Sequence, residues 1–166
     1  MKTTLAQLFL EELQEEAKAT RALLALVPLD KGDYKLHEKS MKLMSLTTHV
    51  AEIPGCFHDI IQKEELDFAK MEYKPFIPLD TTDLLALFDK KYNEAIAILS
   101  NTADEKFDEQ WTMRAGEQIF FTMPKGKVVR TWCLNHWYHH RAQLGLYLRM
   151  LNIPLPSVYG PTVDLS

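Results

Sequence analysis

Apolar side chains recur at three- and four-residue spacing in four long segments, roughly residues 3–27, 40–62, 81–101 and 128–152. This spacing keeps the apolar side chains on one face of a helix, and the opposite faces are polar. The pattern therefore predicts four amphipathic helices of about twenty residues each. The caps expected for the first and third helices are Thr3 or Thr4 and Thr81 or Thr82.

Three features modify this helical pattern. Pro54 and Gly55 interrupt the second helix, where proline removes a backbone hydrogen bond, so we predict a kink there. Segments 110–113 and 118–121 can pair as a short β-hairpin between the third and fourth helices. The proline-rich tail after Asn152 is expected to lie across the bundle as coil. The predicted fold is thus an all-α four-helix bundle with long connections, forming one domain over residues 1–166.

Within these helices, the apolar stripe of the first runs from Leu5 and Leu8 through Phe9 and Leu13 to Val27. The region between the second and third helices, 64–80, is expected to be a polar linker.

The last predicted helix carries two inward-facing histidines. Its apolar stripe contains His140, and His136 lies about 60° from the centre of the stripe, whereas His139 faces outward. Two histidines at i and i+4 project from one helical face and can share a metal ion. The second helix places His49 on its inner face, while His58 points away from it. The spacing therefore favours a metal site made of His49, His136 and His140.

A site of three histidines leaves coordination positions open, which is typical of catalytic metal centres. Position 137 is Trp, whereas the zinc-peptidase pattern H-E-x-x-H requires Glu there, so the general base of that class is absent. The alternative is that these histidines are satisfied by backbone, carboxylates or water. Since imidazole must be neutral to bind a metal, affinity is expected to fall below about pH 6.

Composition excludes several classes of function. The 166-residue chain has a net charge of −4 and no basic run with interleaved aromatics, which argues against nucleic-acid binding. No apolar stretch is long enough for a membrane span, and no signal peptide is evident, so cytoplasmic residence is expected. Cys56 and Cys133 lie in apolar helical patterns and are expected to be buried thiols.

Three motifs carry a family resemblance: LTTHVAE at 46–52, NHWYHHRAQL at 135–144 and PLPSVYGP at 154–161. Together they resemble the DinB/YfiT-like family of metalloenzymes, with Ala142 where glycine is usual. The resemblance implies a four-helix bundle, often homodimeric, with a divalent transition metal, often nickel or zinc, on histidines that match the three above. Some relatives are thiol S-transferases and others isomerases.

From the residues and this resemblance together we expect a divalent-metal-dependent enzyme acting on a small molecule. It would be either a thiol S-transferase that uses a low-molecular-weight thiol or a hydrolase. The alternative is a non-catalytic helical bundle that binds a metal or ligand.

Other residues near the predicted site have two interpretations each. Arg141 and Gln143 can orient a substrate anion or a water, or form a surface salt bridge or helix contact. Glu52 is expected on the solvent side of its helix. The alternative is that it supports His49 as a metal ligand without binding the metal itself. Tyr159 can fold over the open metal position. The following aromatic residues are expected to fill the core or a dimer face rather than line a pocket: Trp111, Trp132, Trp137, Phe120 and Phe121.

Overall fold

The first helix, α1 (Leu5–Leu24), begins with a capping box. Thr4 accepts a hydrogen bond from the Gln7 backbone N–H, and the Gln7 side chain accepts one from Thr4 N–H. The helix buries Phe9 and Leu13, but Leu5 and Leu8 are exposed, so their predicted inner placement was wrong. Each lies about 100° from a buried neighbour, Ala6 or Phe9, because successive residues turn by that angle.

The second helical segment contains the predicted kink. It consists of α2 (Leu43–Glu52), a 3₁₀ turn at Ile53–Gly55 that contains Pro54, and α3 (Cys56–Gln62). The helix begins later than predicted because the preceding loop supplies its first hydrogen bonds. Leu43 N–H donates to Tyr34 O and Met44 N–H to Gly32 O. The loop is therefore an ordered cap for α2 rather than a free connection.

The third long helix is α4 (Thr81–Ser100). Its cap is Asp80, whose side chain accepts a hydrogen bond from Asp83 N–H at 2.8 Å, so the expectation of Thr81 or Thr82 was wrong by one residue. Aspartate at this position also suits the positive end of the helix dipole.

The last helix is continuous but not uniform. It runs from α5 (Lys125–Val128) through a π-helical stretch at Val129–Asn135 into α6 (His136–Met150). The π-helical stretch, which the spacing analysis did not predict, widens the turns immediately before the histidine-bearing part. Short 3₁₀ turns at Leu29–Lys31, Asp104–Asp108 and Val163–Leu165 complete the helical elements of residues 3–165.

The hairpin predicted between the third and fourth helices is present. Strands β2 (Gln110–Ala115) and β3 (Gln118–Pro124) are antiparallel, with Gly116 in the turn at φ 60°. A third strand, β1 (Glu65–Asp67), pairs in parallel with β2 and was missed because it is three residues long and lies in the segment predicted as linker. Asp67 ties it to the hairpin, since its carboxylate accepts hydrogen bonds from Ala69 N–H and Gly116 N–H.

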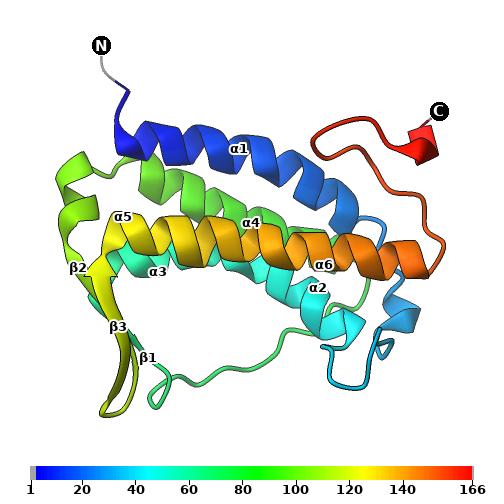
Figure 1. Ribbon diagram of the computed structural model, residues 1–166, viewed down its shortest axis with the longest axis horizontal. Helices are drawn as coiled ribbons and strands as arrows, with labels where there is room; N and C mark the ends of the chain where they lie inside the picture. Colours follow the sequence, from blue (N-terminus) through cyan, green and yellow to red (C-terminus); the bar gives the residue numbers. More distant parts are fainter. Residues whose placement is uncertain (1–2, 166) are drawn as a thin grey trace.

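The computed structural model, which describes residues 3–165, is a four-helix bundle with a small sheet at one end (Figure 1). Helices α1, α4, the α2–α3 pair and the α5–α6 helix lie side by side, and the C-terminal coil packs beside the end of α6. The long connection from β1 to α4 runs along the α2–α3 side. This architecture agrees with the predicted class. Within residues 3–165, no helix has the length and apolar character needed to cross a membrane.

Candidate metal centre

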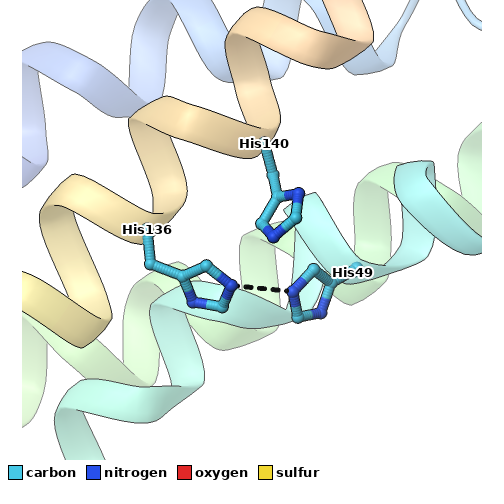
Figure 2. Close-up of side chains that lie close together, drawn as sticks. All are labelled: His49, His136 and His140. Atoms are coloured by element: carbon cyan, nitrogen blue, oxygen red, sulfur yellow. Dashed lines mark hydrogen bonds between the residues drawn. The ribbon is translucent and has the colours of Figure 1, made fainter. Parts of the chain in front are cut away.

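Three imidazoles from two helices converge at one point inside the bundle. His49 comes from α2, and His136 and His140 come from α6, one turn apart. One ring nitrogen of each lies within 4.8 Å of the other two, and His49 Nε2 is 3.2 Å from His136 Nε2. Figure 2 shows the three rings pointing toward one another across the gap between the helices. All three are half-buried.

Local structure sets where each histidine stands. His49 lies on α2 one turn before the Pro54 kink. His136 is the first residue of α6, where the π-helical stretch ends and ordinary α-helical turns resume. From there the 3.6-residue repeat places His140 on the same face. The helix pair α2 and α6 is in direct contact, which brings the three side chains together.

Hydrogen bonds to the far nitrogens determine which nitrogen can bind a metal. His136 Nδ1 is 3.3 Å from the Trp132 carbonyl oxygen, and His140 Nδ1 is 2.8 Å from Gln143 Oε1. A carbonyl oxygen only accepts, so both Nδ1 atoms carry the proton. The Nε2 lone pairs of His136 and His140 are therefore free for a metal ion.

The donor set fits a divalent transition metal. With metal–nitrogen bonds of about 2.0–2.1 Å, two ligand nitrogens on one ion are about 2.9–3.4 Å apart, depending on the bond angle. The 3.2 Å between His49 Nε2 and His136 Nε2 lies in this range. Because His136 Nε2 already has a lone pair, the two nitrogens repel unless a proton or a cation lies between them. A metal ion bound by both nitrogens would remove this repulsion.

Burial keeps these imidazoles neutral. Desolvation lowers the pKa of His49 to about 4, and the neighbouring His140 and His136 add to the effect. Desolvation is also the largest cause of the lowered pKa values of His136 and His140. Neutral imidazole is the form that binds metal, so the site is ready to bind one at neutral pH.

Two pockets meet at the histidines. The first, here the His140 pocket, has a volume of about 730 Å³ and is lined by His49, His140 and residues of the loops at 29–33 and 71–77. The second, here the His136 pocket, has a volume of about 390 Å³ and is lined by His49, His136 and residues of α3, α4 and the sheet. The imidazoles are thus accessible to small molecules from two sides.

Of the other predicted site residues, Gln143 and Glu52 lie near the histidines. Gln143 accepts the His140 hydrogen bond described above. Glu52, expected on the solvent side, lines the His136 pocket and accepts a hydrogen bond from Tyr73 Oη at 3.0 Å. Glu52 is half-buried, and the pocket that it lines is shared with His49 and His136.

Arg141 and Tyr159 lie away from the three histidines. Arg141 is 3% exposed and donates to the Glu16 carbonyl and the Thr20 hydroxyl of α1. Tyr159 bonds Arg141 and the Glu16 carboxylate, and both residues line a separate pocket between α6 and the C-terminal coil. Arg141 thus makes a salt bridge and helix contact, the second of its two interpretations, and Tyr159 packs on this pair rather than over the histidines. Successive residues on a helix diverge by about 100°, so Arg141 faces α1 while His140 faces α2.

The aromatic residues divide between core and pocket. Trp137 is fully buried and donates to Val50 O, as expected of a core residue. Trp111 belongs to the buried core as expected, and Trp132 packs against that core, but both also line the His136 pocket, which was not expected. Phe121 is half-buried between them, and Phe120 is exposed and packs near Phe68.

The segment after β1, expected to be a polar linker, also reaches the site. Met71 and Tyr73 line both pockets, and Phe76 and Ile77 line the His140 pocket. The prolines and charged residues of this segment favoured a plain linker, although its apolar side chains were a signal that it covers something.

Comparison with known proteins agrees with this architecture. The model of the DinB family matches residues 1–164. This chain belongs to the DinB family. Among solved structures, DinB-like proteins from Bacillus subtilis and Bacillus cereus match it with TM-scores of 0.68 and 0.71. Each is 20% identical, and the matches cover 91% and 96% of this chain and 97% and 100% of those chains. At this identity the likeness shows a shared fold, and no curated protein matches.

Proposed function

We propose that this DinB family protein is a divalent-metal-dependent enzyme that acts on a small molecule. We favour transfer to a low-molecular-weight thiol, with hydrolysis as the second candidate. The observation that carries the proposal is the convergence of three neutral imidazoles where two pockets meet. Three protein ligands leave positions for substrate, as in catalytic metal sites. Nickel or zinc is the ion that we expect, acting in the cytoplasm.

Different residues of this chain would bind the metal ion and orient its ligands. His49, His136 and His140 would hold the ion. When bound, the ion would supply Lewis-acid chemistry, lowering the pKa of a thiol or water. Gln143 and the Trp132 carbonyl keep the Nδ1 protons of His140 and His136 in place, so the Nε2 atoms stay available.

Glu52 is a candidate proton acceptor. It follows His49 by three residues on α2 and lines the same pocket as His49 and His136. Its hydrogen bond from Tyr73 orients the carboxylate. A nearby carboxylate can take the proton that a thiol or water releases, a role that H-E-x-x-H proteins assign to the Glu missing at position 137.

Turnover assays test the proposal. Protein purified without an affinity tag and loaded with nickel or zinc is mixed with a panel of thiols and an alkylating substrate, and with ester and amide substrates. We expect turnover that His140→Ala abolishes. The matched control is His139→Ala, which changes an exposed histidine on the same helix and should leave the activity unchanged.

Two results would contradict the proposal. Stoichiometric metal with no turnover on any substrate would identify the non-catalytic metal-binding bundle. Equal turnover in wild type and His140→Ala would place the chemistry away from the histidines.

A further inference from the structure

The connection between β1 and α4 forms a wall of both pockets at the histidines. Its residues 71–78 have no regular secondary structure and run as an extended coil along the α2–α3 side (Figure 1). Long loops without secondary structure are uncommon in compact domains and often serve as active-site lids. Five side chains of this segment line the His140 pocket, and the first two of them also line the His136 pocket: Met71, Tyr73, Pro75, Phe76 and Ile77.

The 71–78 segment is held firmly on both sides. Before it, the Asp67 carboxylate accepts hydrogen bonds from Ala69 N–H and Gly116 N–H, which tie the chain to the β-hairpin. After it, the Asp83 carboxylate of α4 accepts a hydrogen bond from Leu79 N–H at 3.2 Å. These two attachments can act as hinges while the chain between them moves.

Between these attachments the segment is weakly held. Among residues 3–165, the backbone of residues 72–78 has no hydrogen-bond partner, and Pro75 and Pro78 have no N–H to donate. Tyr73 is 53% exposed and Ile77 is 71% exposed, so little of the segment is buried. Segments with few hydrogen bonds and little burial open locally at a low cost in free energy.

One side-chain hydrogen bond ties the segment to the histidine-bearing part of the bundle. Tyr73 Oη donates to Glu52 Oε2 at 3.0 Å, and Glu52 follows His49 by three residues on α2. The acceptor is a carboxylate, and hydrogen bonds to charged groups are stronger than those between neutral groups. Since Tyr73 lines both pockets, breaking this bond would let the segment move away from both at once.

We propose that the 71–78 segment is a lid over the candidate metal centre and that the Tyr73–Glu52 hydrogen bond is its latch. With the bond made, the lid walls both pockets. With the bond broken, the lid moves on its two attachments and exposes the histidines to solvent. Such a lid admits a small molecule and then shields it from water. Because the lid controls access to the same histidines, its role rests on the proposed function.

Chymotrypsin cleavage tests the latch, because a protease cuts a segment when it is open. Cleavage at the Phe76–Ile77 bond is followed by mass spectrometry in the protein as purified. Tyr73→Phe removes only the hydroxyl and should accelerate this cleavage about fivefold, as expected for the loss of one hydrogen bond. The matched control is Tyr92→Phe, which removes a hydroxyl from the α1–α4 side and should leave the rate unchanged. An unchanged rate in Tyr73→Phe would overturn the proposal.

A double variant shows whether Tyr73 acts through Glu52. Glu52→Ala removes the acceptor of the same bond, so it should accelerate cleavage about as much as Tyr73→Phe. The variant carrying both changes should be cleaved within about twofold of either single variant, because the bond can be lost only once. Effects that multiply in the double variant would contradict the latch.

Acylation of histidines tests whether the lid controls access. Diethyl pyrocarbonate acylates neutral imidazole, and a chelator first removes any bound metal. In Tyr73→Phe, we expect acylation of His49, His136 and His140 to rise by the same factor as the cleavage. The exposed His139 is the internal reference and should react at the wild-type rate. Faster cleavage with unchanged acylation would show a moving segment that is not a lid.

Neither measurement depends on bound metal or on turnover. If Tyr73→Phe accelerates both cleavage and acylation in a protein without turnover, the proposed function fails and the lid stands. If the wild-type protein turns over a substrate but Tyr73→Phe changes neither rate, the lid fails alone.

Discussion

Gln143 determines which ring nitrogen of His140 is free to bind a metal. It lies three residues after His140 on α6, and its Oε1 is 2.8 Å from His140 Nδ1. The Trp132 carbonyl does the same for His136. The helical repeat could predict that His136 and His140 share a face. It could not predict the Trp132 contact, because the π-helical stretch changes the spacing of the preceding turns.

Replacing Gln143 should therefore weaken metal binding. Gln143→Ala removes the acceptor that holds the His140 tautomer, and we expect affinity to fall about tenfold. A titration against a competing chelator measures this. Gln143→Glu, which keeps an acceptor at the same place, should retain wild-type affinity or exceed it. Unchanged affinity in the alanine variant would show that the hydrogen bond is irrelevant to the ligand.

The pH dependence of metal binding should reflect the lowered histidine pKa values. Protons compete with metal for imidazole, and burial lowers the pKa of His49 to about 4. The pKa values of His136 and His140 are also below the ordinary value. Affinity should stay level at neutral pH and begin to fall only below about 6.5, the ordinary imidazole value, with protonation of His49 adding to the loss as pH approaches 4. Affinity that already halves between pH 8 and pH 7 would contradict it.

At the scale of elements, interruptions of regular structure place the site. The kink at Pro54 follows His49 by one turn, and the π-helical stretch ends at His136. The kink was predictable from Pro54 itself. The parallel strand β1 was not, because pairing of three residues with a distant hairpin leaves no periodic signal in the chain. That pairing brings Leu66 and Met113 to the His136 pocket.

The hairpin turn depends on one glycine. Gly116 has φ 60°, the left-handed region that suits the first central residue of a two-residue hairpin turn. Gly116→Ala should destabilise the protein by about 1 kcal/mol, which lowers the melting temperature by about 3 °C for a chain of this size. Thermal unfolding followed by circular dichroism measures this. Glu117→Ala, at the next and exposed position, is the control and should melt within about 1 °C of wild type.

At the scale of the whole molecule, a buried ion pair fastens α6 and the C-terminal coil to α1. Arg141 pairs with the Glu16 carboxylate and also bonds Tyr159. The sequence predicts the bundle because helical periodicity is a local property. The position of the coil depends on the hydrogen bond between Tyr159 and Glu16, which are 143 residues apart in sequence. Local patterns cannot indicate such a contact.

Arg141→Met should therefore change stability without changing the metal site. Removing one partner of a buried pair leaves Glu16 uncompensated, and we expect a loss of about 3 kcal/mol in the free energy of unfolding. Urea unfolding measures it. Arg21→Met, which breaks an exposed pair with Asp89, should cost less than about 1 kcal/mol. Loss of metal from folded Arg141→Met would contradict the separation of this network from the histidines.

The most direct test of the account is the metal content of protein purified without an affinity tag, measured by inductively coupled plasma analysis. We expect one divalent transition-metal ion per chain in wild type and in His139→Ala, and none in His140→Ala, with the helical content of all three alike. Equal metal content in wild type and His140→Ala would contradict a shared site at His49, His136 and His140.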